Sequence, residues 1–210
     1  MSDLEQLAEQ VRTCQKCRLA QGRLRAVPGE GPEDADILFI GEAPGFNEDR
    51  QGRPFVGPSG NLLEQLIAGL GLTRKQVYIA NVIKCRPPEN RDPLPDEIEA
   101  CRPYLDRQIE LIQPKLVITL GRFSMARSFP GQSITRIHGQ IKHEGGVSIV
   151  PMFHPAAALR NPQWMEEMKK DFARLAPLVA DLGKQKTAQA PAPQDPPGPP
   201  PDEYQQLSLF

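Results

Sequence analysis

The chain contains four short runs of apolar residues rich in β-branched side chains, and these runs limit the folds it can adopt. They occupy residues 36–40, 77–83, 116–120 and 147–152. Their hydrophobicity is continuous rather than alternating, which is typical of strands buried on both faces. Because helical patterns lie between them, the sequence predicts an α/β fold: a three-layer α/β/α sandwich with a central, mostly parallel four-stranded sheet.

Helix signals fill the intervals between these runs. Amphipathic patterns cover residues 4–11 and 165–178, and Ser59 is expected to cap a helix after the first strand. A further pattern covers residues 98–112, where we expect Pro103 to kink or restart the helix.

The C-terminal part of the 210-residue chain differs in composition from the rest. Seven of the twenty residues from 184 to 203 are Pro, and the only apolar residues there are Ala. Such a segment cannot form a core. We therefore expect a folded domain over residues 1–183, a disordered linker over 184–203 and a separate short segment over 204–210.

Charge and hydropathy exclude several classes of protein. Lys and Arg total 25 against 26 Asp and Glu, a formal net charge of −1, which argues against a polybasic nucleic-acid binder. Neither an apolar run of about eighteen residues nor a basic, then apolar N-terminus is present. We therefore expect a cytoplasmic protein without membrane contact.

The chain has four cysteines in two pairs. Cys14 and Cys17 have C-x-x-C spacing, and fifteen residues separate Cys85 from Cys101. The two pairs can meet if the N-terminal segment folds beside the second predicted strand. A cytoplasmic setting disfavours disulfides, so spacing alone leaves zinc, an iron–sulfur cluster or unrelated buried thiols.

Polar residues are concentrated where the predicted strands end. Residues 41–45 follow the first run, Asn81 lies in the second, and His154 follows the fourth. In parallel sheets, ligands bind beyond the carboxyl ends of the strands. The sequence therefore predicts one site formed by these segments.

The same segments carry a resemblance to a known family. Residues 41–45 with Glu48 and Asp49, together with residues 52–57, 81–88 and 154–162 and the four cysteines, resemble family 4 uracil-DNA glycosylases. The resemblance implies a uracil-DNA glycosylase fold and a 4Fe–4S cluster held by Cys14, Cys17, Cys85 and Cys101. It also implies that the protein removes uracil from DNA to start base excision repair.

One subgroup of these enzymes traps the abasic sugar covalently on a histidine. That subgroup carries Gln at the position of Ala43 and an insertion shortly after it. This chain runs directly from Asp49 to Phe55 without an insertion or a histidine, so we expect turnover. Because the matched motifs place no Lys as an imine-forming nucleophile, we also expect a monofunctional enzyme that leaves an abasic site.

Recognition of uracil requires the nucleotide to leave the base stack and enter a pocket. We expect Phe55 to stack on the base. The amide of Asn81 complements the O4 and N3–H groups of uracil, provided that it is held in one orientation. The resemblance places Gly41, Ala43 and Glu48 in the same pocket.

Cleavage of the N-glycosidic bond places negative charge on the uracil and positive charge on the sugar. His154, as a neutral imidazole, can donate a hydrogen bond to the developing negative charge on O2. Glu42 can stabilise the sugar cation or orient water. Asn90 matches a family position associated with activity, and its alternative role is that of a turn residue.

DNA contacts are expected on both sides of this pocket. Lys84, Arg86 and Arg91 are predicted to reach phosphates. Leu159 and Arg160 are predicted to enter the groove, although Leu159 also fits a plain helix core. The expected substrate is uracil-containing DNA, double- or single-stranded, bound by a monomer that is associated with the nucleoid during repair.

The last residues carry a further motif: Gln206, Leu207, Ser208, Leu209 and Phe210. They resemble the short segment with which bacterial repair proteins bind the DNA sliding clamp. Two alternatives to the overall prediction stay open. One is a non-catalytic iron–sulfur DNA-binding or redox module on the same fold. The other is a glycosylase for a different deaminated base.

Overall fold

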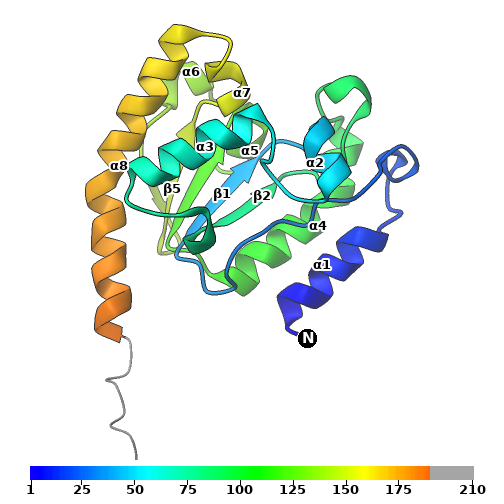
Figure 1. Cartoon of the computed structure of the whole chain (residues 1–210), viewed down its shortest axis with the longest axis horizontal. Coiled ribbons are helices and arrows are strands. Elements are labelled where there is room, and N and C mark those ends of the chain that lie inside the picture. Colours follow the sequence, from blue (N-terminus) through cyan, green and yellow to red (C-terminus); the bar gives the residue numbers. More distant parts are fainter. Residues whose placement is uncertain (190–210) are drawn as a thin grey trace, which may run out of the picture.

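The four apolar runs form the parallel part of one central sheet in a computed structural model of the chain (Figure 1). These strands are β1 (Ile37–Gly41), β2 (Tyr78–Asn81), β3 (Leu116–Leu120) and β5 (Val147–Met152). β1 pairs in parallel with both β2 and β3, and β3 pairs in parallel with β5. The prediction of a mostly parallel sheet is therefore confirmed.

The sheet has five strands rather than the four predicted, in the order β2-β1-β3-β5-β4. The additional strand β4 (Lys142–Glu144) pairs antiparallel with β5 at the sheet edge. Its side chains are half-buried or exposed and polar, so it carries no apolar run. Short, charged edge strands of this kind discourage pairing with other chains.

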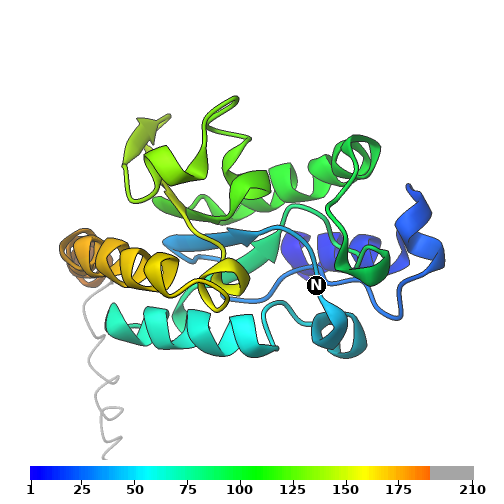
Figure 2. The same cartoon turned by 90° about the horizontal axis from the view of Figure 1, so that it is seen from above.

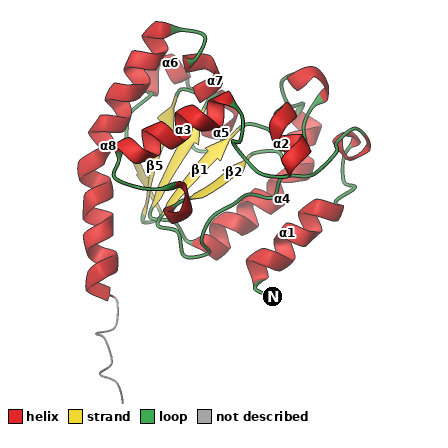
Figure 3. Cartoon of the chain, in the orientation of Figure 1, coloured by secondary structure: helices red, strands yellow, loops and turns green. Residues whose placement is uncertain are grey.

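Helices cover both faces of the sheet and form the two outer layers of the sandwich (Figures 2 and 3). α3 (Pro58–Gly69) and α8 (Pro162–Gln189) pack on one face, where Phe39 and Ile118 point. α1 (Asp3–Thr13) and α4 (Pro95–Ile112) cover the other, where Leu38 and Val117 point. Because side chains alternate along a strand, each buried strand contributes to two cores.

Two helices differ in detail from the sequence prediction. α3 begins at Pro58 and is preceded by Gly57 as its cap, not by Ser59. Proline is favoured at the first helical position because its missing N–H would have no partner there. α4 is continuous through Pro103, so the predicted restart does not occur. Buried neighbours on α4, including Cys101 and Leu105, hold it against the sheet.

Short helices follow the carboxyl ends of the strands. α2 (Phe46–Gln51) comes after β1, α5 (Arg122–Met125) after β3 and α7 (Pro155–Ala158) after β5. α6 (Ile134–Ile137) and the 3₁₀ turns η1 (Arg18–Gln21), η2 (Arg74–Gln76) and η3 (Pro88–Asn90) complete the elements. The segments that bear the predicted site therefore meet at one edge of the sheet.

The structure describes residues 1–189, with side chains described through residue 183. α8 continues past Gly183, the predicted end of the folded domain, to Gln189. The remaining linker and the proposed clamp-binding residues 206–210 lie outside the described residues. Among the helices that are described, none combines the length and apolar character needed to cross a membrane.

Candidate active site

A cleft of about 470 Å³ opens at the carboxyl ends of the strands. Its walls come from the segments that follow β1, β2 and β5 and from the loop before α3. It brings together most of the predicted catalytic and uracil-binding residues, with two of the predicted DNA-contacting arginines: Glu42, Ala43, Glu48, Phe55, Asn81, Asn90, Arg91, His154 and Arg160.

Asn81 lies at the inner end of the cleft, and Gly41 lies beside it in the register of β2 and β1. Asn81 is 2% exposed, and its Oδ1 atom has no hydrogen-bond partner. A Cβ atom on Gly41 would lie 2.4 Å from this Oδ1 and 2.6 Å from the ring of Phe55. Gly41 does not line the cleft, and its role is to leave room for the two side chains that do.

His154 lies at the start of α7, and its ring stacks on that of Phe55 with 5.7 Å between centroids. Its Nδ1 accepts a hydrogen bond from the backbone N–H of Ala156 at 3.1 Å. Nδ1 therefore carries no proton, and the proton of the neutral ring lies on Nε2. Burial lowers the pKa of His154 to about 4, although the charge of Glu48 opposes this shift.

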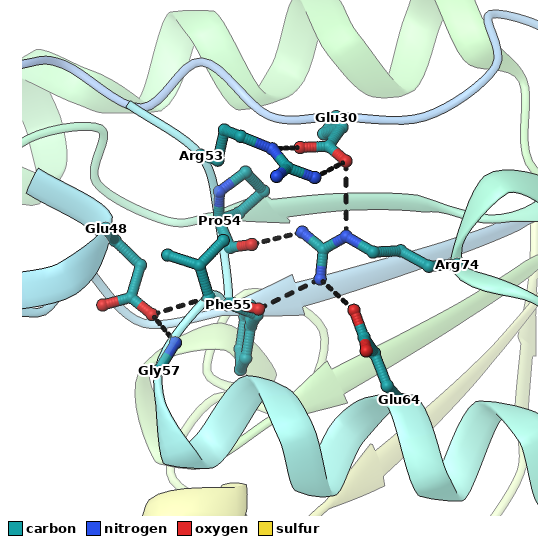
Figure 4. A network of polar contacts seen from close by, with 9 residues as sticks. Glu30, Glu48, Arg53, Pro54, Phe55, Gly57, Glu64 and Arg74 are labelled. Atoms are coloured by element: carbon teal, nitrogen blue, oxygen red, sulfur yellow. Dashed lines mark hydrogen bonds and ion pairs between the residues drawn. The ribbon is translucent and has the colours of Figure 1, made fainter. Parts of the chain in front are cut away.

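Phe55 lines the cleft and also belongs to the buried core between α3 and the sheet. Its φ of 50° lies in the left-handed region, which is unusual for a bulky residue. On one side of it, Glu48 accepts hydrogen bonds from the backbone N–H groups of Val56 and Gly57 (Figure 4). Glu48 also accepts from Gly45. It therefore holds the cleft wall together in addition to lining it.

Glu42 follows β1 at the mouth of the cleft. Burial raises its pKa above the ordinary value, the negative charge of Asp92 raises it further, and the charge of Arg122 opposes both. Asp92 and Arg122 form an ion pair with each other. Asp92 lines the cleft and was not selected from the sequence, where an Asp in a Pro-rich loop is unremarkable.

Asn90 lies in a turn in which it and Glu89 both have positive φ. Its Oδ1 accepts a hydrogen bond from Nε of Arg86 at 2.7 Å. The same guanidinium lies 5.2 Å from the ring centroid of Phe46, and that of Arg50 lies 5.5 Å from it. Phe46 is 51% exposed, so it and the two arginines form a cationic aromatic surface. Sequence reasoning did not select Phe46.

The remaining predicted DNA contacts differ in their surroundings. Arg91 pairs through both of its terminal nitrogens with the buried Glu97, so it fixes the loop while lining the cleft. Arg160 also lines the cleft, and the neighbouring Leu159 is 48% exposed. This exposure excludes the alternative that Leu159 is a plain core residue.

Lys84 does not reach phosphate, and that prediction is wrong. The side chain is 1% exposed, and its Nζ donates to the carbonyl of Asn81 at 2.8 Å and to Gln108 at 2.6 Å. Burial lowers the pKa of Lys84 to about 8. An amine buried without a carboxylate partner is compatible with the fold because these two oxygens accept its hydrogen bonds.

Comparisons with known proteins agree with this geometry. Residues 28–181 match the uracil DNA glycosylase superfamily. A type-4 uracil-DNA glycosylase from Sulfurisphaera tokodaii is 50% identical over 189 residues, which cover 85% of this chain and 86% of the relative. Type-4 enzymes from Saccharolobus solfataricus and Thermotoga maritima are 49% and 45% identical, covering 83% and 75% of this chain and 86% and 84% of the relatives.

The chain belongs to the type-4 uracil-DNA glycosylase family. It is therefore an enzyme that hydrolyses the N-glycosyl bond of uracil in DNA, and DNA is its substrate.

The four cysteines of this glycosylase line a common cavity between the N-terminal segment and α4. Lys84 N and an Arg23 guanidinium N–H donate hydrogen bonds to the sulfurs of Cys101 and Cys85, at 3.2 and 3.1 Å. Within residues 1–189, no group of three or more His, Cys, Asp or Glu is arranged to hold a single metal ion. The donor set is nevertheless all thiol, and backbone and guanidinium N–H groups directed at sulfur fit an anionic iron–sulfur centre.

Proposed function

We propose that this glycosylase excises uracil through the residue roles described below. The observation that best supports this proposal concerns Asn81. The buried Oδ1 of Asn81 lacks a partner in the same cleft that holds His154, Phe55 and Glu42. A buried acceptor without a partner is rare and costly in a folded protein. The N3–H group of a flipped uracil supplies the missing donor, while the Asn81 amide N–H donates to O4.

Cytosine fails at this position because its N3 is an acceptor and its exocyclic group at C4 is a donor. Gly41 leaves the room that Oδ1 occupies, since a Cβ atom there would lie 2.4 Å from it, and discrimination requires that the amide keeps this orientation when the base is bound. Phe55 stacks against the base from the cleft wall that its ring shares with His154. Ala43 and Glu48 close the pocket around these contacts.

Catalysis depends on polar and charged side chains that are in position before the N-glycosidic bond breaks. His154 donates its Nε2–H to O2 of the base, where negative charge grows as the C1′–N1 bond lengthens and its electron pair moves to uracil. The carboxylate of Glu42 stabilises the positive sugar and orients the water that adds to C1′, with Asn90 holding the same water. The water oxygen forms the new bond to C1′, and the proton that the water loses neutralises the uracil anion, so the products are uracil and an abasic site, without strand cleavage.

The cysteine cavity is proposed to hold one 4Fe–4S cluster on Cys14, Cys17, Cys85 and Cys101. When bound, the cluster ties the N-terminal segment to the loop that ends at α4. An all-thiol site is compatible with zinc as well as with a cluster. Membership of the type-4 family, together with the four cysteines that line one cavity, supports the cluster.

DNA is proposed to cross the mouth of the cleft between two exposed features. Leu159 and Arg160 enter the groove as the base leaves. On the other rim, the ring of Phe46 with Arg86 and Arg50 offers stacking and positive charge to the strand. Residues 206–210 are proposed to bind the sliding clamp, and the enzyme is proposed to act as a cytoplasmic, nucleoid-associated monomer.

The first test uses end-labelled oligonucleotides that contain U·G, U·A, T·G or single-stranded U, in single-turnover reactions with and without alkali. Strand breaks that require both uracil and alkali support the monofunctional mechanism. Breaks without alkali would contradict it, and no excision by cluster-loaded protein would favour the non-catalytic module. Excision from oligonucleotides that contain other deaminated bases tests the second alternative, a glycosylase whose main substrate is a different base.

A parallel test addresses the clamp. Deletion of residues 206–210 should abolish binding to a purified bacterial sliding clamp while leaving excision from short oligonucleotides unchanged. Equal clamp affinity of the deleted and full-length chains would remove this proposal.

A further inference from the structure

The loop that carries Phe55 has an unfavourable backbone conformation at Phe55 itself. Phe55 has a φ of 50°, and its side chain is only 6% exposed. Bulky residues seldom adopt this region without support from their surroundings, because the Cβ atom crowds the backbone. The position of its ring therefore depends on whatever holds the two peptide groups around it.

Arg74, the first residue of η2, holds the carbonyl side of this segment (Figure 4). Its Nη1 donates to the carbonyl of Phe55 at 3.0 Å, and its Nη2 donates to the carbonyl of Pro54. The side chain is 12% exposed. A planar guanidinium can bind two successive carbonyls in a fixed geometry, which a flexible ammonium group cannot.

Carboxylates orient this guanidinium in turn. Glu30 lies 3.3 Å from Nε of Arg74, and Glu64 of α3 lies 3.6 Å from Nη1. Glu30 also pairs with Arg53 through two hydrogen bonds of 2.7 Å. Arg74 is thus fixed by residues that lie before and after the loop in the sequence.

Arg74 and Glu48 approach the loop from opposite sides (Figure 4). Arg74 binds the carbonyls of residues 54 and 55, and Glu48 binds the N–H groups of residues 56 and 57. Glu48 lines the cleft, whereas Arg74 is not among the residues that do. We therefore expect Arg74 to act on the reaction through the loop that it holds and not by contact with the substrate.

We propose that Arg74 is a positioning residue for uracil excision, which keeps Phe55 in its left-handed conformation and so places the ring against the base. The inference rests on the proposed stacking role of Phe55. Loss of the two carbonyl contacts should let the loop relax to ordinary φ values. The ring would then leave its position beside Gly41 and His154.

A double-mutant cycle tests this in the full-length, cluster-loaded protein. We would compare Arg74→Ala in the presence of Phe55 with the same change in a Phe55→Ala background. The readout is the single-turnover rate of uracil release from a single-stranded oligonucleotide at saturating enzyme. We expect Arg74→Ala to lower the rate about tenfold when Phe55 is present and less than about twofold when it is absent, because residues that act as a unit are not additive.

Two further variants separate positioning from folding. Arg53→Ala removes the other cation paired with Glu30 but no donor to the carbonyls of residues 54 and 55, so it should change the rate less than about twofold. Arg74→Lys keeps the charge yet cannot bridge both carbonyls, and it should give a rate between those of Arg74→Ala and the unmodified protein. It also provides the measurement if Arg74→Ala does not fold.

The outcomes are distinct. Equal losses in the two backgrounds, or an unchanged rate in a folded Arg74 variant, would overturn the inference. An unchanged rate in Phe55→Ala alone would instead remove the proposed role of Phe55. A loss for Phe55→Ala without any loss for Arg74→Ala or Arg74→Lys would leave that role intact and reject the positioning by Arg74.

Discussion

Acidifying the reaction to about pH 5.5 should leave the imidazole of His154 neutral and able to act. Burial lowers the pKa of this side chain to about 4. At about pH 5.5, a histidine with the ordinary pKa of about 6.5 would be neutral in only about one molecule in eleven, whereas one with a pKa of about 4 stays about 97% neutral. The two cases differ by about tenfold in the active fraction.

Glu42 complicates the simple pH profile because its pKa is raised and its proposed role, stabilising the sugar cation, requires it to be ionised. Its protonation should lower the rate as the pH falls through that raised pKa. The comparison is therefore made in Glu42→Gln, whose residual single-turnover rate reports on His154. We expect this rate to change little between about pH 8 and 5.5. A tenfold fall that disappears in the Glu42→Gln, His154→Asn double variant would refute the reasoning.

The same shift has a consequence for stability. Between about pH 6.5 and 4, the unfolded chain binds a proton at His154 that the folded chain does not. The free energy of unfolding should therefore decrease as the pH falls through this window, and this contribution should be fully present above it. Urea denaturation of the unmodified protein and of His154→Asn at several pH values measures the difference.

Four further outcomes are expected. Gly41→Ala should lower the single-turnover rate at least about tenfold and reduce stability by about 1–3 kcal/mol in urea denaturation, since its Cβ would meet Asn81 and Phe55 at 2.4 and 2.6 Å. Asn81→Asp should reduce the preference for uracil over cytosine in competition assays, because a carboxylate cannot donate to O4; unchanged selectivity would argue against the contact. Cys85→Ala should lose the visible absorbance of the cluster and most soluble protein, and retained absorbance would exclude Cys85 as a ligand. Phe46→Ala should weaken DNA binding about fivefold in anisotropy titrations. Leu24→Ala removes another exposed apolar side chain and should leave DNA binding unchanged. Equal effects of the two substitutions would contradict a specific role of Phe46 in DNA binding.

The sheet could be predicted from sequence because its information is local. The runs that became β1, β2, β3 and β5 are predominantly apolar and short, a pattern typical of strands buried on both faces. β4 could not be found in this way, since Lys142 and His143 pair with β5 at an edge where no core selects apolar residues. Helix bounds also depended on local choices, and Gly57 rather than Ser59 precedes α3.

The cleft was predicted less completely because its contacts join distant segments. Lys84 follows a strand and precedes a cysteine, a context that gives no sign of burial. Its burial depends on Gln108, which α4 brings to its Nζ. Likewise, nothing near Arg74 in the sequence indicates that it reaches the carbonyl of Phe55. Sequence motifs identify residues that touch the base more readily than residues that hold those residues in place.

The short helix α7 links two events at the DNA surface. His154 caps its beginning, and the exposed Leu159 caps its end, with backbone bonds from Ala158 and Leu159 back to residues 154 and 155. One helical turn therefore separates the imidazole from the exposed Leu159. If Leu159 enters the groove as proposed, the depth of its entry and the position of the imidazole in the cleft are set by the same short element.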